Sequence, residues 1–96
     1  MGAIKSNNYT ENEQELFLTA RAFAHPARIK MMKMMLSGNG FRNIDLCAEL
    51  NLTKRSVKNH IEMFKDAKLI EIEYFIHYYK ISLNEEGQTK ATNFLG

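Results

Sequence analysis

The sequence contains few of the residues that mark secreted, membrane-bound or disulfide-stabilised proteins. Its 96 residues include one cysteine, one proline and no tryptophan. The single cysteine, Cys47, cannot form an internal disulfide, which fits a reducing compartment. No apolar run approaches the roughly 18 residues of a membrane span, and no segment has the composition of a signal peptide. We therefore expect one domain that works in the cytoplasm without a membrane.

The sequence also lacks a strong charge of either sign. It has 13 Lys and Arg against 11 Asp and Glu, for a net charge of +2. Nucleic-acid binding must therefore be argued from where the charge lies and not from its total. Residues 53–68 are rich in lysine and arginine, whereas acidic residues gather in residues 11–15 and 71–73. The basic charge is concentrated in one segment.

Catalytic motifs are missing as well. There is no serine, histidine and aspartate set, no glycine-rich phosphate loop and no pair of carboxylates that would converge in a cleft. We predict that the chain is not an enzyme and needs no cofactor.

The segment 53–69 predicts the central element, a helix with one apolar side. Thr53 is a suitable N-cap, and Val57, Ile61, Phe64 and Lys68 recur at a helical period. The opposite side and its flank carry Lys54, Arg55, Lys58 and Asn59. This pattern favours a helix that packs on one side and contacts a groove on the other.

A shorter helix is predicted just before it, over residues 43–50. Ile44, Cys47 and Leu50 would form its buried side, and Asn51-Leu52 makes a tight connection to the next cap. A short helix, a brief turn and a longer basic helix indicate a helix-turn-helix over residues 43–68.

Two further helices are predicted upstream. Residues 1–9 are polar and are expected to be a flexible arm, and the pair Thr10 and Glu13 predicts a capping box for a helix over 11–24. Pro26 starts a second helix that ends at Gly38, and the residues 38–40 form a turn. On the first helix the predicted apolar stripe is formed by Leu16, Phe17, Ala20, Phe23 and Ala24, while Leu18 and Ala22 lie off it. A helix that is apolar on more than one side suggests a partner subunit.

Downstream of the basic helix the apolar period changes to two. Strands are predicted at 70–74 and 77–83, joined at Phe75-Ile76, within a hairpin over 69–83. A last helix over 84–95 is capped by Asn84, and Gly87 weakens it by about 1 kcal/mol relative to alanine. The predicted fold class is mostly α with a small β-hairpin: a winged helix-turn-helix of about five helices with a two-stranded wing, forming one domain over residues 10–96.

Two segments give this fold a family resemblance. FAHPARIKMMKMML (23–36) resembles the segment of the ArsR family of bacterial repressors that contains an Asp-Pro-x-Arg motif, with Pro26 and Arg28 in register. The helix-turn-helix segment 44–71 is similar to the corresponding family segment. The positions that match there and on the wing are Asp45, Leu46, Leu50, Val57, His60, Leu69 and Tyr79. The resemblance implies a dimeric, DNA-binding transcription regulator, most often a repressor.

The chain departs from the family at its metal sites. Where many metal-sensing members have two cysteines at the start of the third helix, this chain has Arg42 and Ile44. Residues 84–95 contain no histidine or cysteine, so the second metal site of the family also lacks its ligands. We predict no metal site, and the sequence does not indicate an effector.

The predicted DNA contacts lie mostly on the basic helix. Arginine, lysine and asparagine can read base edges in the major groove, whereas Arg42 and Lys80 would contact phosphates. The full predicted set is Arg42, Thr53, Lys54, Arg55, Ser56, Lys58, Asn59 and Lys80. A solvated helix face is the simpler alternative for this cluster, and a winged-helix protein-interaction module without DNA binding is the alternative function. His60 is expected to be a half-buried packing residue.

Two other surfaces carry predictions. The partner in a homodimer would contact the first and last helices through Leu16, Phe17, Ala20, Phe23, Ala91, Phe94 and Leu95. The wing carries Glu71 and Glu73, which phosphates repel. We expect the wing to contribute little DNA affinity, or its apolar tip to pack elsewhere.

Overall fold

The computed structural model describes residues 8–38 and 40–96 and confirms the winged helix-turn-helix fold class. The predicted arm over 1–9 falls mostly on residues 1–7, and the predicted turn at 38–40 includes Asn39; these residues lie outside the described part. The elements are α1 (Glu11–Phe23), α2 (Pro26–Ser37), β1 (Phe41–Arg42), α3 (Asn43–Leu50), α4 (Lys54–Asp66), β2 (Ile70–Tyr74), β3 (Tyr79–Leu83) and α5 (Glu85–Leu95).

The helices begin where their capping residues indicate. Thr10 Oγ1 accepts from the Glu13 N–H at 3.0 Å, and the Glu13 carboxylate accepts from the Thr10 N–H at 2.8 Å, which confirms the capping box of α1. Asn84 Oδ1 accepts from the Gly87 N–H at 2.7 Å and starts α5. The cap of α2 was not predicted: His25 Nδ1 accepts from the Ala27 N–H at 3.0 Å.

The helix-turn-helix consists of α3 and α4. Asn51 ends α3 in the left-handed conformation (φ 54°), and Thr53 Oγ1 caps α4 by accepting from the Ser56 N–H at 3.1 Å. α4 ends at Asp66, earlier than predicted, because Lys68 adopts φ 60° and turns the chain into β2. Lys68 is exposed and does not extend the apolar side of α4.

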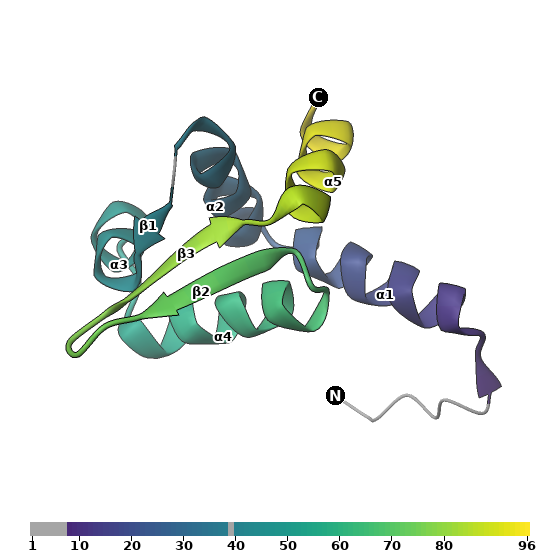
Figure 1. The fold of residues 1–96 in the computed structure, drawn as a ribbon, viewed down its shortest axis with the longest axis horizontal. Helices are drawn as coiled ribbons and strands as arrows, with labels where there is room; N and C mark the ends of the chain where they lie inside the picture. Colours follow the sequence, from purple (N-terminus) through teal and green to yellow (C-terminus); the bar gives the residue numbers. More distant parts are fainter. Residues whose placement is uncertain (1–7, 39) are drawn as a thin grey trace.

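The sheet has one strand more than predicted. Its antiparallel order is β1-β3-β2, with Ile72 opposite Ile81 in the hairpin and Phe41 opposite Ile81 on the other side. β1 has only two residues, too few to show an alternating pattern. The Phe75 N–H donates to the Tyr78 carbonyl at 2.8 Å and closes the wing tip. The hairpin extends away from α5 and the C-terminus (Figure 1).

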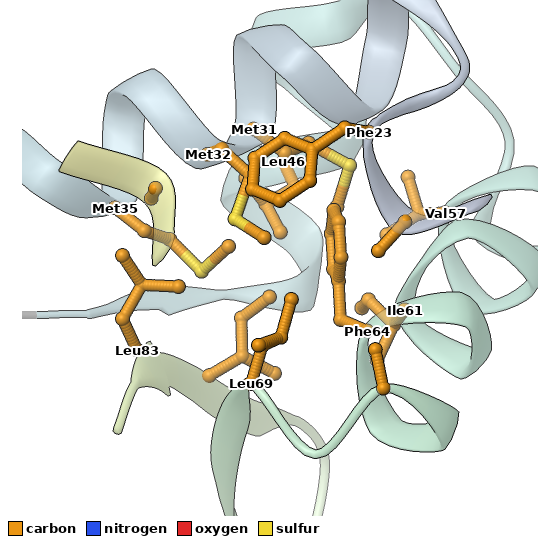
Figure 2. Packing of buried hydrophobic residues seen from close by; sticks show 14 residues of the cluster. Phe23, Met31, Met32, Met35, Leu46, Val57, Ile61, Phe64, Leu69 and Leu83 are labelled. Atoms are coloured by element: carbon orange, nitrogen blue, oxygen red, sulfur yellow. The ribbon is translucent and has the colours of Figure 1, made fainter. Parts of the chain in front are cut away.

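The core joins all five helices of the described chain to the sheet. Phe64 of α4 is fully buried and lies near Phe23 of α1, Leu69 and the methionine side chains of α2 (Figure 2). Methionine side chains adapt to irregular gaps, which suits a core lined from several directions. The core residues are Ala22, Phe23, Met31, Met32, Met35, Leu46, Val57, Ile61, Phe64, Ala67, Leu69, Ile81, Leu83 and Ala91.

Two predicted packing faces need correction. In α3 the fully buried side chain is Leu46, whereas Ile44, Cys47 and Leu50 are half-buried. α3 is covered on two sides, by α4 and by the sheet, so its buried face is shifted. In α1 the buried side chains are Ala22 and Phe23, with Leu18 half-buried against the core. The predicted stripe residues Leu16, Phe17, Ala20 and Ala24 are exposed.

Gly87 is a packing requirement and not only a weak point of α5. A Cβ at this position would overlap the carbonyl oxygen of Leu69 and lie 3.1 Å from Leu83 Cδ2. Asn84 fixes the same contact, since its Nδ2 donates to the Lys68 carbonyl at 2.9 Å. α5 therefore docks closely on the turn between α4 and β2.

Candidate nucleic-acid interface

The outer face of α4 presents the predicted base-reading side chains together. Lys54, Arg55, Lys58 and Asn59 are all exposed, while the opposite side of the helix is anchored in the core. Within the described chain, the cations of this face form no ion pair. Their charge and hydrogen-bond donors are therefore available to a ligand.

The start of α4 adds backbone donors to this face. Thr53 is exposed, but its hydroxyl oxygen already accepts from the Ser56 N–H, and Ser56 itself is half-buried. The remaining first-turn N–H groups lie at the positive end of the helix dipole, an arrangement that favours anions such as phosphate. The local role of Thr53 is thus to hold the helix start, with Lys54 and Arg55 next to it.

Arg42 and Lys80 lie on the neighbouring strands β1 and β3 and not on α4. They are opposite one another in the β1-β3 pairing. Arg42 is held by Asp45, with Nη2–Oδ1 and Nε–Oδ2 distances of 2.8 and 3.0 Å, and its guanidinium lies 5.6 Å from the Tyr78 ring centre. The hydrogen bonds from Arg42 lower the pKa of Asp45. A phosphate at Arg42 must therefore compete with this carboxylate.

The wing has an exposed apolar tip. Ile76 is 93% exposed, and Phe75 stacks on Tyr78 with ring centres 4.7 Å apart. The tip therefore does not pack against another part of the described chain. Glu73 lies opposite Lys80 in the hairpin, so one wing carboxylate faces a cation.

A groove between α4 and the wing was not predicted. It has a volume of ≈ 330 Å³. It is lined from α4 by Lys58, Ile61, Glu62 and Lys65, and from the wing by Ile72, Tyr74 and Tyr79. Burial raises the pKa of Tyr79, so its hydroxyl stays protonated and can donate. The alternating pattern of the hairpin placed the aromatic side chains on one strand face, but only tertiary packing brings that face to α4.

His60 lies next to Asn59 on α4 and is half-buried, in line with the expectation for it. Its Nδ1 is 3.0 Å from Arg28 Nη1, and its ring centre is 4.6 Å from that of His25. Burial first, and then the charges of His25 and Arg28, lower the pKa of His60. The sequence resemblance included Arg28 and His60 separately but gave no signal that they touch.

The residues predicted for a subunit interface divide into two groups. Phe23 is 3% exposed and Ala91 is 0% exposed, so both belong to the core of this chain. Leu16 and Phe94 are each 60% exposed, and Phe94 stacks on Phe23 with ring centres 4.3 Å apart. Phe17 and Ala20 are also exposed and Leu95 is half-buried. Leu16 and Phe94 line one surface hollow between α1 and α5. The predicted interface residues that remain accessible on these two helices are Leu16, Phe17, Ala20, Phe94 and Leu95, and we call them the apolar face.

Among residues 8–38 and 40–96, no three histidine, cysteine, aspartate or glutamate side chains are grouped to hold a metal ion. The thiol of Cys47 is half-buried and belongs to no such group. None of the described helices has the length and apolar character needed to cross a membrane.

Comparison with solved structures identifies similar folds. HlyU from Vibrio cholerae N16961 matches with a TM-score of 0.75 and 15% identity, covering 90% of this chain and 94% of that one. An ArsR family transcriptional regulator matches with a TM-score of 0.73 and 18% identity over 91% and 89% of the two chains. A transcriptional regulator homologue from Pyrococcus horikoshii OT3 matches with a TM-score of 0.72 and 20% identity over 85% and 87%. No protein-family profile and no curated protein sequence matches the chain. The chain therefore has an ArsR-like winged helix-turn-helix fold.

Proposed function

We propose that the chain is a sequence-specific, double-stranded DNA-binding transcription regulator, a repressor that acts as a homodimer in the cytoplasm. The outer face of α4 is the observation that carries this proposal. It presents Lys54, Arg55, Lys58 and Asn59 to solvent from a helix whose other side is fixed in the core. The fold shared with known transcription regulators supports it. Residues 10–96 would act as one DNA-binding domain.

In this proposal α4 is the recognition helix. Arginine and lysine pair with guanine and asparagine pairs with adenine in the major groove, each good pair discriminating by about 1–3 kcal/mol. Arg55 and Asn59, which lie farthest from the buried side, are suited to read bases. Lys54 and Lys58 on the flank, with Lys80 on the wing, are suited to phosphates.

The homodimer would form through the apolar face of α1 and α5. Large apolar side chains such as Leu16 and Phe94 are usually covered when they lie together on a surface. A two-fold dimer would place two recognition helices in successive major grooves about 34 Å apart and read a pseudo-palindromic operator. Neither α4 nor its anchoring residues belong to this face, so DNA binding and dimerisation can be tested separately.

The proposal is tested by selecting duplexes from a random library and measuring binding over a range of salt concentrations. Arg55→Ala should lower affinity for the selected duplex by about 1–3 kcal/mol and relax the sequence preference at one position. Lys54→Ala should weaken all duplexes similarly and reduce the salt slope by about 1. Lys33→Ala is a matched control, because Lys33 is an exposed lysine on α2 outside the proposed interface.

A protein-interaction module without DNA binding is the alternative function. The exposed carboxylates of Glu71 and Glu73 on the wing favour it, because phosphates repel them. It predicts that no duplex binds with a salt dependence and that Arg55→Ala has no effect. Absence of salt-dependent duplex binding, or binding that neither Arg55→Ala nor Lys54→Ala changes, would contradict the DNA-binding proposal.

A further inference from the structure

Two histidines and an arginine connect α4 to the junction between α1 and α2. Arg28 Nη1 donates to His60 Nδ1 at 3.0 Å, and Arg28 Nε donates to the Arg21 carbonyl oxygen at 3.1 Å. His25 Nδ1 accepts from the Ala27 N–H at 3.0 Å and caps α2, while its ring contacts the ring of His60. One arginine thus joins the end of α1 to the middle of α4.

This arrangement requires both imidazole rings to be neutral at Nδ1. A guanidinium has five N–H donors and no acceptor, so His60 Nδ1 must supply the lone pair. The backbone N–H of Ala27 makes the same demand of His25 Nδ1. Protonation turns each Nδ1 into a donor that faces another donor, and it places new positive charges beside Arg28. Both hydrogen bonds are lost when the rings become charged.

The surrounding charges do not compensate for this. Arg21 of α1 is the other charged group near Arg28, and its guanidinium pairs with Asp66 at 2.8 Å. On α3, which also packs on α4, the Asp45 carboxylate is held by Arg42. The carboxylates of β2 and Glu49 of α3 are exposed. Within the described residues no carboxylate bonds to either imidazole.

We propose that His25, Arg28 and His60 form a proton-sensitive clamp that holds α4 against the α1-α2 junction, and that acidification releases it and weakens sequence-specific DNA binding. The inference rests on the proposed function and names a regulation of the same site. α1 belongs to the proposed dimer face and α4 to the DNA face, so the clamp fixes how one is placed relative to the other. Two recognition helices can match the operator spacing only while that placement is fixed.

Asparagine variants separate titration from structure. Asn Oδ1 lies close to the position of His Nδ1 and accepts a hydrogen bond but does not titrate. His60→Asn keeps the acceptor for Arg28, and His25→Asn keeps a good N-cap for α2. His77→Asn is the matched control, because His77 is the third histidine of the chain and is exposed on the wing.

The first readout is the affinity for a selected duplex divided by that for a scrambled duplex, which cancels the general attraction of added charge for phosphate. Between about pH 7.5 and about pH 5.5 this ratio should fall about tenfold in the wild type. The lower pH lies about one unit below the ordinary histidine pKa, and one unit corresponds to a tenfold change in an equilibrium constant. It should fall less than about threefold in His60→Asn and His25→Asn, and as in the wild type in His77→Asn. The proposal is overturned if the wild-type ratio does not depend on pH, or if the ratio falls as much in the His60→Asn and His25→Asn variants as in the wild type.

A second readout needs no DNA. The hydrogen-exchange protection factor of the Ala27 amide should fall on acidification in the wild type and stay constant in His25→Asn. Constant protection in the wild type overturns the clamp even if DNA binding is pH-dependent. If no duplex binds at any pH, the proposed function fails, and the Ala27 measurement still decides whether the clamp responds to protons.

Discussion

The two exposed helical surfaces of this molecule differ in chemistry. The outer face of α4 carries Lys54, Arg55 and Lys58, whose charges are well solvated in water. The face formed by α1 and α5 carries Leu16 and Phe94, each 60% exposed. Apolar area left in water costs about 25 cal/mol per Å² relative to burial. The difference indicates a reversible polar contact at α4 and a more permanent apolar contact at α1 and α5.

The two surfaces also differ in how firmly the chain supports them. α4 is anchored along its length by Val57, Ile61 and Phe64, which are at most 2% exposed. α1 is buried mainly at its C-terminal end, and its N-terminal part projects from the rest of the fold (Figure 1). Ion pairs of Arg21 with Asp66 and Lys90 with Glu15 hold it in place. α4 is anchored by this chain alone, whereas α1 would gain support from a partner.

Gly87→Ala should have the largest effect, because it displaces α5, which carries part of the apolar face, from the turn between α4 and β2. The new Cβ would overlap the Leu69 carbonyl oxygen, and overpacking of this kind costs up to about 3 kcal/mol of unfolding free energy. This exceeds the gain in helix propensity of about 1 kcal/mol. Denaturant unfolding measures the difference, with Gln88→Ala at an exposed neighbouring position as the control. A variant as stable as the wild type would show that α5 does not dock as described.

Leu16→Glu should disrupt the apolar face of α1 and α5 and leave the outer face of α4 unchanged. A charge on the apolar face should weaken self-association by about 2 kcal/mol per substituted site, measured by sedimentation equilibrium. The fold should remain intact because Leu16 is largely exposed. Ile76→Glu is the matched control, since Ile76 is still more exposed but lies at the wing tip. Dissociation by Ile76→Glu and not by Leu16→Glu would move the proposed interface to the wing.

The comparison also explains which parts of the structure the sequence could predict. α4 has a single buried side, so its helical period from Val57 to Phe64, the Thr53 cap and the exposure of its outer face were read correctly from local pattern. The extension of that period to Lys68 was wrong, because the chain leaves the helix after Asp66. The hairpin strands alternate between an inward and an outward face, as predicted. β2 has its predicted bounds, whereas β3 begins at Tyr79 and not at residue 77, because residues 75–78 form the tip of the hairpin. Residues 53–66 and 70–83 are segments in which local and tertiary structure demand the same pattern.

The predictions failed where tertiary contacts decide. α1 is apolar on two sides, and only packing against α2 and α4 selects Ala22 over Ala20 as the buried residue. β1 forms because Phe41 and Arg42 pair with the free edge of β3. A segment of two residues is too short for its sequence pattern to predict a strand. Gly87 was interpreted from helix propensity, which contains no information about the Leu69 carbonyl. The clamp of Arg28 and His60 joins residues 32 positions apart.

Thr53→Ala should cost less than either substitution above. Loss of the N-cap hydrogen bond to Ser56 is expected to lower the unfolding free energy by about 1 kcal/mol and to fray the start of α4, where Lys54 and Arg55 lie. Thr10→Ala removes the equivalent cap of α1 and serves as the comparison. DNA affinity should fall in the first variant and not in the second. Equal losses of DNA affinity in Thr53→Ala and Thr10→Ala would contradict this prediction, because they would show that affinity does not depend specifically on the start of α4.

The smallest effect is the pH dependence of stability from His60. Burial first, and then the neighbouring His25 and Arg28, lower the pKa of His60 in the folded state, whereas the unfolded chain titrates near the ordinary value of about 6.5. The unfolded state therefore binds more protons below that value, so the contribution to stability is complete above it and is lost as pH falls toward the folded-state pKa. Unfolding curves between about pH 7.5 and about pH 5 should show this loss in the wild type and not in His60→Asn. The pKa values of the Asp45 and Glu86 carboxyl groups are lowered, so both groups titrate below this window. Their titration therefore does not overlap that of His60. If the unfolding free energies of the wild type and the His60→Asn variant depend on pH in the same way, the prediction is wrong. The His60 imidazole would then be as well solvated as the exposed lysine side chains of α4.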